Sequence, residues 1–319
     1  MNRSTSMYQD MASRTGSSIY IGVVGPVRTG KSTFIKRFME TQVLPNIEND
    51  YRRERARDEL PQSGSGRTIM TAEPKFVPEE AAEVRLPDGT SFSVRLIDCV
   101  GYMVPGAVGQ FEDLAPRMVM TPWYDHEIPM TEAAELGTRK VICEHSTVGI
   151  VITTDGSIAD LPRDSYIEAE AEVIDELTQI GKPFIIIVNS KDPSSIQCRS
   201  VVDKLKEKTQ VPVLPMAVNR LDEDDIHALL REALYEFPVS EINVQMPKWV
   251  SVLSDEHWLK QSVNGSIEES MKAITKLREV EGIVDILNEN EYVEKANLAT
   301  VDTGKGVAVV DLEVKSGLY

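Results

Sequence analysis

The sequence contains few cysteines and histidines, and neither set is arranged as a metal site or a disulfide framework. Three of the 319 residues are cysteine, at Cys99, Cys143 and Cys198, and four are histidine. The cysteines are scattered and odd in number, and no pair has metal-ligand spacing. The histidines have no spacing typical of a metal site or a catalytic triad. This cysteine usage is typical of a protein in a reducing cytosol.

Long hydrophobic runs are also absent. No stretch approaches the 18 consecutive apolar residues that would span a bilayer. Residues 1–18 are polar and lack the apolar core of a signal peptide. We therefore expect an intracellular, cytoplasmic protein with no transmembrane segment of its own.

Positive charge is scarce relative to negative charge. The chain has 34 Lys and Arg residues against 51 Asp and Glu residues, which gives a net charge of −17. Because the phosphate backbone of a nucleic acid attracts clustered cations, this balance argues against nucleic acid as the main partner. Hydrophobic residues make up 41% of the chain, which is typical of a globular protein long enough for two domains.

Two kinds of apolar segment alternate along the first 240 residues. Short β-branched runs predict buried strands, and segments with apolar residues at helical spacing predict helices between them. The predicted strands are 19–25, 92–101, 148–156, 184–190 and 211–218, and the predicted helices are 31–40, 131–146, 166–183 and 222–237. This alternation predicts an α/β fold with a mostly parallel sheet and helices on both faces.

Two stretches do not fit the alternation. Residues 49–71 are charged and then rich in Ser and Gly, which predicts a flexible surface segment. Residues 102–130 show little periodicity and are longer than most loops, which indicates a functional or mobile segment.

The remaining residues have a different pattern. Residues 242–253 are predicted to be extended, 266–290 to form one long charged helix, and 306–314 to form a strand. We predict three parts: an N-terminal polar segment at 1–18, a P-loop nucleotide-binding domain at 19–240, and a small α+β domain at 241–319.

A phosphate-binding motif stands between the first predicted strand and the first predicted helix. Gly25, Gly30, Lys31 and Ser32 match G-x-x-x-x-G-K-[ST], the P-loop. Its glycines allow backbone angles that turn N–H groups inward at a helix N-terminus, where they bind anions. Lys31 is expected to reach the β- and γ-phosphates, and the Ser32 hydroxyl to ligate Mg²⁺. The nucleotide-binding residues predicted in this loop are Gly25, Pro26, Val27, Arg28, Thr29, Gly30, Lys31, Ser32 and Thr33.

Further elements of a nucleotide switch follow. Asp98 and Gly101 form D-x-x-G at the end of a predicted strand, where Asp98 would hold Mg²⁺ and Gly101 would contact a γ-phosphate. Thr68 and Thr71 are both candidates for the threonine that completes Mg²⁺ coordination. Tyr102 stands where such enzymes carry a water-positioning glutamine, which predicts slow hydrolysis unless another group takes that role.

The base-recognition segment is ambiguous. Asn189 and Asp192 have the spacing of N-x-x-D, in which the aspartate would accept hydrogen bonds from guanine. Position 190, however, is serine, and the lysine of the usual N-K-x-D comes one residue later, at Lys191. Spacing alone fits either a guanine site or an acidic loop beside adenine.

Six segments of the chain are distinctive beyond the P-loop: YIGVVGPVRTGKSTFIKRFME, ARDELPQSGSGRTIMTAEPKFVP, DCVGYMVPGA, PRMVMTPWY, EAAELGTRKVICEHSTVGIVITTDG and REALYEFPV. Together they resemble the stage IV sporulation protein A family, the coat-base ATPases of endospore-forming bacteria. The resemblance extends from about residue 7 to the end of the chain.

This resemblance implies a function. Members of the family are similar to translation-factor-type GTPases that have changed to ATP, and ATP hydrolysis drives their self-assembly into a polymer around the forespore. On that pattern Lys31, Thr71 and Asp98 are the catalytic residues, and Ser32, Thr71 and Asp98 hold the Mg²⁺. Some relatives have two adjacent threonines, but Ala72 follows Thr71 here. The implied partners are further copies of the chain and other spore coat proteins.

Two points stay open. The family continues into a C-terminal domain implicated in binding a small amphipathic peptide that anchors the layer to the forespore membrane, and we expect that domain to be missing here. The alternative function is a GTP-hydrolysing switch of the translation-factor class that regulates a partner without polymerising.

Overall fold

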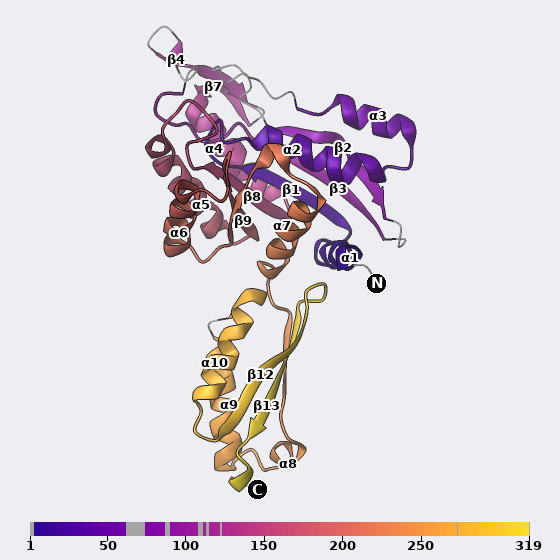
Figure 1. Cartoon of the computed structure of the whole chain (residues 1–319), viewed down its shortest axis with the longest axis vertical. Helices are drawn as coiled ribbons and strands as arrows, with labels where there is room; N and C mark the ends of the chain where they lie inside the picture. Colours follow the sequence, from indigo (N-terminus) through magenta and orange to yellow (C-terminus); the bar gives the residue numbers. More distant parts are fainter. Residues whose placement is uncertain are drawn as a thin grey trace. The chain divides into compact units, whose positions relative to one another are not determined.

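The structure is a computed structural model, and it describes residues 3–61, 74–86, 90–107, 111–112, 115–121, 123–272 and 274–318. The chain divides into two compact units, which Figure 1 shows in colours that follow the sequence. The first unit comprises Met1–Tyr8 and Thr15–Ala233, and the second comprises Gln9–Arg14 and Leu234–Tyr319.

A six-stranded sheet forms the centre of the first unit, with the strand order β10-β9-β8-β1-β3-β2. Neighbouring strands are parallel except β2, which runs antiparallel to β3 at one edge. The strands are β1 (Ser18–Val24), β2 (Lys75–Arg85), β3 (Ser91–Asp98), β8 (Val148–Thr154), β9 (Phe184–Asn189) and β10 (Val213–Met216). The predicted α/β fold with a mostly parallel sheet is confirmed.

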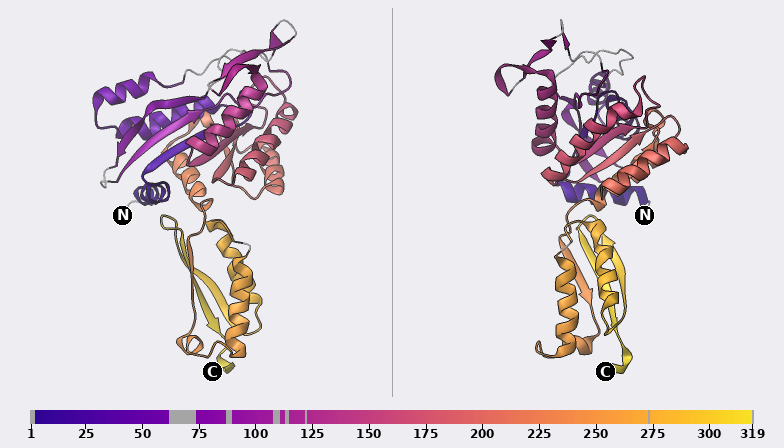
Figure 2. Two further views of the ribbon diagram at one scale, coloured as in Figure 1. Left: turned by 180° about the vertical axis from the view of Figure 1, so that it is seen from behind. Right: turned by 90° about the vertical axis from the view of Figure 1, so that its left-hand side faces the viewer.

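Helices cover both faces of this sheet, as predicted (Figure 2). On one face, α5 (Ile167–Ile180) and α6 (Ile196–Lys208) pack their apolar residues against β8 and β9 in a single buried cluster. On the other face, Phe38 of α2 (Lys31–Phe38) and Leu230 of α7 (Glu223–Tyr235) line the same narrow space as Ile19 of β1.

Several elements were not predicted. The polar N-terminal segment contains α1 (Arg3–Thr15), whose Met7 and Met11 are buried at helical spacing. Within 49–71, predicted to be flexible, residues 50–58 form α3 (Asp50–Asp58), because the Asn49 side chain accepts the Arg52 N–H at 3.0 Å and caps the helix. The described part of 102–130 contains the strands β4 (Phe111–Glu112), β5 (Ala115–Pro116), β6 (Met118–Thr121) and β7 (Tyr124–Pro129). The helix α4 (Met130–Lys140) follows them and corresponds to the predicted helix at 131–146.

The second unit contains a three-stranded sheet with the order β11-β13-β12. Its strands are β11 (Glu241–Gln245), β12 (Val293–Asp302) and β13 (Val307–Val314), and β11 is parallel to β13 while β12 is antiparallel. The helices α9 (Trp258–Met271) and α10 (Glu281–Glu289) pack against this sheet and form its core. The short helix α8 (Lys248–Ser251) interrupts the segment 242–253, so the prediction that it is extended is wrong beyond β11.

The prediction of one long helix over 266–290 is also wrong. The helix α9 ends at Met271, and a 3-10 turn at Leu277–Val280 precedes α10. The Glu279 carboxylate accepts the backbone N–H groups of Thr275 at 2.7 Å and Lys276 at 2.9 Å. This capping box starts a new helix, so the charged pattern continues across a break in the backbone.

Membrane-spanning helices are not found in the part of the chain that the structure describes. No helix there is both long enough and apolar enough to cross a bilayer.

We predict that Lys182 stabilises the first unit by closing the turn that follows α4. Its ammonium donates to the carbonyl oxygens of Ile142, Cys143 and Ser146 at 2.7, 2.6 and 2.8 Å. Lys182→Met keeps the chain length but removes the charged donor, so the free energy of unfolding should fall by about 2 kcal/mol in urea denaturation. Lys206→Met, at an exposed position of α6, is the matched control. If Lys182→Met and Lys206→Met lowered the free energy of unfolding by the same amount, this role of Lys182 would be contradicted.

Candidate nucleotide-binding site

The loop between β1 and α2 has the backbone shape of an anion-binding site. Gly25, Arg28 and Gly30 have positive φ angles of 128°, 65° and 99°. A Cβ atom on Gly25 would lie 2.4 Å from the carbonyl oxygen of Ile152, and one on Gly30 would lie 2.4 Å from Nδ2 of Asn189. Only glycine fits at these two positions. The loop leads directly into the N-terminus of α2, where backbone N–H groups attract phosphate.

Lys31 lies at the start of α2 and is buried against this loop. Its Nζ donates to the carbonyl oxygens of Gly25 at 3.2 Å and Pro26 at 2.7 Å. Burial lowers the pKa of the ammonium to about 8, although the nearby Asp98 carboxylate raises it. An ammonium has three N–H donors, so one remains for an anion, and a phosphate beside it would favour the charged form.

Ser32 and Asp98 meet next to Lys31. The Ser32 hydroxyl donates to Oδ2 of Asp98 at 2.6 Å. The other carboxylate oxygen, Oδ1, is buried and has no hydrogen-bond partner within the described residues. Burial raises the pKa of Asp98, while the Ser32 hydrogen bond and Lys31 lower it.

This pair of side chains fits a magnesium ion. Hydroxyl and carboxylate oxygens are ligands that Mg²⁺ prefers, and a cation would satisfy the buried Oδ1 of Asp98. Across the described residues there is no group of three or more His, Cys, Asp or Glu that could hold a metal. Magnesium in phosphate sites does not need such a group, because the phosphates and water supply the remaining ligands.

The D-x-x-G segment is joined to the P-loop by its backbone. The Tyr102 N–H donates to the carbonyl of Gly25 at 3.2 Å, and the Val27 N–H donates to the carbonyl of Tyr102 at 2.9 Å. Gly101 has a φ of 95°, and a Cβ atom there would lie 2.3 Å from Nζ of Lys31. The structure therefore brings together four of the predicted site residues: Lys31, Ser32, Asp98 and Gly101.

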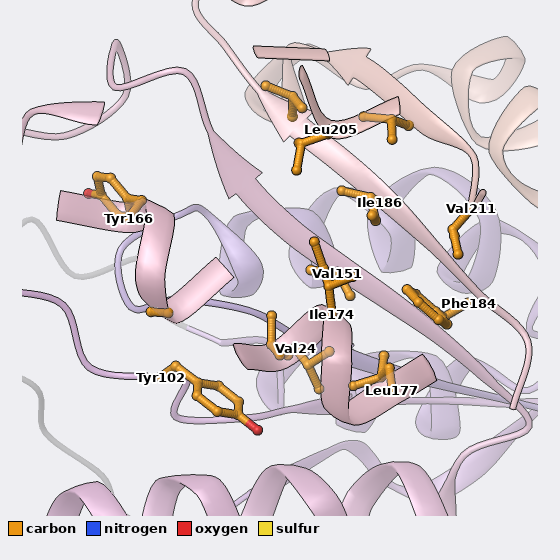
Figure 3. Close-up of a cluster of buried hydrophobic side chains, with 14 of the residues drawn as sticks. Val24, Tyr102, Val151, Tyr166, Ile174, Leu177, Phe184, Ile186, Leu205 and Val211 are labelled. Atoms are coloured by element: carbon orange, nitrogen blue, oxygen red, sulfur yellow. The ribbon is translucent and has the colours of Figure 1, made fainter. Parts of the chain in front are cut away.

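Tyr102 does not replace the missing glutamine. Its side chain is buried in the hydrophobic cluster that contains Val24, Ile174 and Leu177 (Figure 3). Its hydroxyl donates to Glu176 of α5. A phenol held in this way cannot position an attacking water.

Asn189 is brought to the P-loop, where it connects two backbone segments. Its Nδ2 donates to the carbonyl of Thr29 at 2.8 Å, and its Oδ1 accepts the N–H of Val218 at 3.1 Å. Both ends of the amide are therefore used within the protein. Asn189 supports the loop, and the hydrogen bonds place it beside the phosphate end of the site.

Asp192 lies on the surface, with hydrogen bonds inside its own turn. Its Oδ1 accepts the N–H and the hydroxyl of Ser194 at 3.0 and 2.6 Å, and these bonds lower the pKa of the carboxyl. Two residues before Asp192, Ser190 is buried and donates to Oδ2 of Asp155 at 2.6 Å. Asp155 was not identified from the sequence. The pattern that could have indicated it is an acidic residue directly after the buried strand β8.

The predicted switch threonines cannot be placed. Thr68 and Thr71 lie outside the described residues, as does Ala72. The role of Thr71 in magnesium coordination stays a prediction.

Comparison with known proteins identifies the family. Residues 1–238 match the model of the stage IV sporulation protein A ATPase domain, and residues 239–319 match the model of the middle domain of the same protein. The chain belongs to the stage IV sporulation protein A family. The resemblance seen in the sequence is confirmed.

Two relatives show how far the similarity extends. The chain is 54% identical over 313 residues to stage IV sporulation protein A of Bacillus subtilis (strain 168) and 47% identical to that of Clostridioides difficile (strain 630). Each alignment covers 98% of this chain and 64% of the relative, so the chain spans about 64% of the length of the curated relatives it matches.

A solved structure is more distantly similar. The apo form of translation elongation factor SelB from Methanococcus maripaludis is 12% identical, with a TM-score of 0.37 over 68% of this chain and 33% of that chain. A similarity of this size carries no argument about the site.

We predict that Asp98→Asn removes the magnesium dependence of nucleotide binding. The amide keeps the shape and can still accept the Ser32 hydroxyl, but it lacks the charge that a cation requires. Calorimetric titration with ATP should give the same affinity with and without Mg²⁺, whereas the unaltered chain should bind ATP about tenfold more tightly with Mg²⁺. Asp203→Asn, on the exposed face of α6, is the control. A retained magnesium effect in Asp98→Asn would show that Asp98 does not hold the ion.

Proposed function

We propose that this chain binds ATP with Mg²⁺ and hydrolyses it. The observation that carries the proposal is the assembly of Lys31, Ser32, Asp98 and Gly101 at the N-terminus of α2, with a buried Asp98 oxygen that lacks a partner. The family assignment supports it, because the matching domain is described as an ATPase domain.

Each residue has a role that follows from its position. Backbone N–H groups of the loop 25–30 would bind the phosphates, and Lys31 would neutralise the charge that develops on the γ-phosphate. Ser32, Asp98 and Thr71 would hold Mg²⁺, which when bound neutralises charge on the β- and γ-phosphate oxygens. Gly101 would offer its N–H to the γ-phosphate. Catalysis in this arrangement is by positioning and electrostatics, and the protein forms no covalent intermediate.

The base segment favours ATP over GTP. Position 190 is a buried serine bonded to Asp155, where a guanine-binding segment carries lysine. Both hydrogen bonds from Ser194 reach Oδ1 of Asp192, so they do not by themselves prevent Oδ2 from accepting a hydrogen bond from a base. The spacing of Asn189 and Asp192 nevertheless supports a second candidate, a GTP-hydrolysing switch that regulates a partner.

The larger role follows from family membership and is likewise a proposal. ATP hydrolysis would drive copies of this chain to self-assemble into the basement layer of the spore coat, on the mother-cell side of the forespore surface. Other coat proteins would bind this layer. A P-loop domain at 19–240 would carry the hydrolysis, and the α+β domain at 241–319 would contribute a contact between copies. A small amphipathic membrane-anchoring peptide would be a further partner, through the C-terminal domain of the family.

We predict ATP-selective phosphate release that depends on Lys31. The purified chain is given ATP and GTP in parallel with Mg²⁺, and phosphate release is measured for the unaltered chain and for Lys31→Ala. Loss of the lysine should lower the rate at least about a hundredfold, because a charge-stabilising donor to the transition state is removed. Lys31→Ala should still unfold cooperatively, since its two hydrogen bonds go to loop carbonyls.

The base preference decides between the two candidate functions. GTP-selective release would mean that Asn189 and Asp192 bind guanine, and would overturn the ATPase proposal. Nucleotide binding without any phosphate release would leave a protein that uses nucleotide only as a structural ligand.

We predict that self-assembly requires a nucleotide site that both binds and hydrolyses ATP. In sedimentation, the unaltered chain with Mg²⁺ and ATP should move into the pellet as its concentration rises, and Lys31→Ala should stay in the supernatant. Hydrolysis of ATP by a chain that stays monomeric at every concentration would instead fit a switch that does not polymerise.

A further inference from the structure

Tyr102 occupies an unusual place between the catalytic residues and the protein core. It directly follows Gly101, and its two backbone hydrogen bonds join the D-x-x-G segment to the P-loop at Gly25 and Val27. These two bonds form an isolated parallel β-bridge between Pro26 and Tyr102, and they connect the two loops where Lys31 lies. Tyr102 is therefore the point where D-x-x-G is attached to the phosphate-binding loop.

The Tyr102 side chain is also fixed at its far end. Only 4% of Tyr102 is exposed, and its hydroxyl donates to Oε2 of Glu176. The other oxygen of that carboxylate, Oε1, accepts Nε of Arg139 at 2.8 Å. The Glu176 side chain is 17% exposed and that of Arg139 is 59% exposed, so the chain of contacts extends from the P-loop to the surface between α4 and α5.

The residue that this arrangement holds is Gly101. A glycine is free to adopt many backbone conformations, and its φ of 95° places it directly against Nζ of Lys31. Glycine has no side chain that could hold Gly101 in this conformation. The neighbouring anchor at Tyr102 can, because both the backbone and the phenol of that residue are bonded to fixed parts of the domain.

We propose that Tyr102 is a positioning residue for hydrolysis, which holds Gly101 beside Lys31 through its backbone bridge to the P-loop and its hydroxyl bond to Glu176. This inference rests on the proposed function and assigns to position 102 a task other than placing water. A contact made to the γ-phosphate in the transition state is sensitive to displacements of about 1 Å. Binding of ATP in the ground state depends mainly on the loop and on Lys31, so it should change little.

The first test is Tyr102→Phe, which removes one oxygen and keeps the ring in the core. With Mg²⁺ and ATP, kcat should fall about tenfold while KM changes less than about twofold, because the variant keeps the two backbone bonds to Gly25 and Val27 of the P-loop and loses only the hydroxyl bond to Glu176. A lower fraction of active protein would also lower the apparent kcat at an unchanged KM, so kcat is expressed per active site, counted by ATP titration, and the melting temperature is measured alongside. A kcat that returns to the value of the unaltered chain after this correction would show a merely structural role and overturn the proposal.

Glu176 provides the complementary variants. Glu176→Gln keeps an oxygen that can accept the phenol, so kcat should stay within about threefold of the unaltered chain. Glu176→Ala should lose as much as Tyr102→Phe, and the double variant Tyr102→Phe/Glu176→Ala should lose little more than either single change. Additive losses would show that the two residues act separately and would overturn the proposal.

Thr178→Val is the matched control on the same helix. The Thr178 hydroxyl donates to the carbonyl of Ile174 at 2.7 Å, and its removal costs a hydrogen bond in α5 without touching Tyr102. Its kcat should be unchanged. An equal loss of kcat in Thr178→Val would mean that any loosening of α5 slows hydrolysis, and would overturn the specific role of Tyr102.

The outcomes separate this inference from the proposed function. If the unaltered chain hydrolyses ATP and Lys31→Ala does not, but Tyr102→Phe keeps its full kcat, the positioning role is wrong and the ATPase proposal stands. If the unaltered chain releases no phosphate, the proposed function fails and the role of Tyr102 in hydrolysis fails with it.

Discussion

The parallel pairing of β1 with β3 is the constraint on which the site depends. It sets Val23 opposite Asp98, so the P-loop and the D-x-x-G segment leave the sheet side by side at its carboxyl edge. Hydrogen bonds between the two segments then bring Ser32 to Asp98 and Gly101 to Lys31. A slip of one residue in this register would turn alternate side chains to the other face and separate these groups.

The site that this pairing assembles holds two buried charged groups, Lys31 and Asp98. Lys31 and Asp98 are taken from water by the surrounding sheet and helices, which lowers the pKa of the ammonium and raises that of the carboxyl. Each is only partly compensated, by loop carbonyls and by one hydroxyl. Such groups are stabilised further by an anion and a cation, which is the combination that a magnesium nucleotide supplies.

A second level of support comes from residues that never need to touch a nucleotide. Asn189 joins Thr29 to the segment after β10, and Tyr102 joins the P-loop to α5. Asn189 is bonded through both atoms of its amide, and Tyr102 is bonded through its backbone and its hydroxyl. Each residue therefore holds one segment of the chain against another. Loops that carry phosphate contacts on a rigid sheet require such connections, because glycine-rich backbone does not hold its own shape.

The sequence by itself determined the parallel sheet, the P-loop and the D-x-x-G pair, because strand patterns and glycine positions are local properties of the chain. It did not determine α3 or the break before α10, which depend on single caps at Asn49 and Glu279 within strongly charged segments. Only the tertiary structure decided that Tyr102 is bonded to Glu176 and that Asn189 supports the P-loop. Their partners lie 74 and 160 residues away, at a distance along the chain that no local pattern encodes.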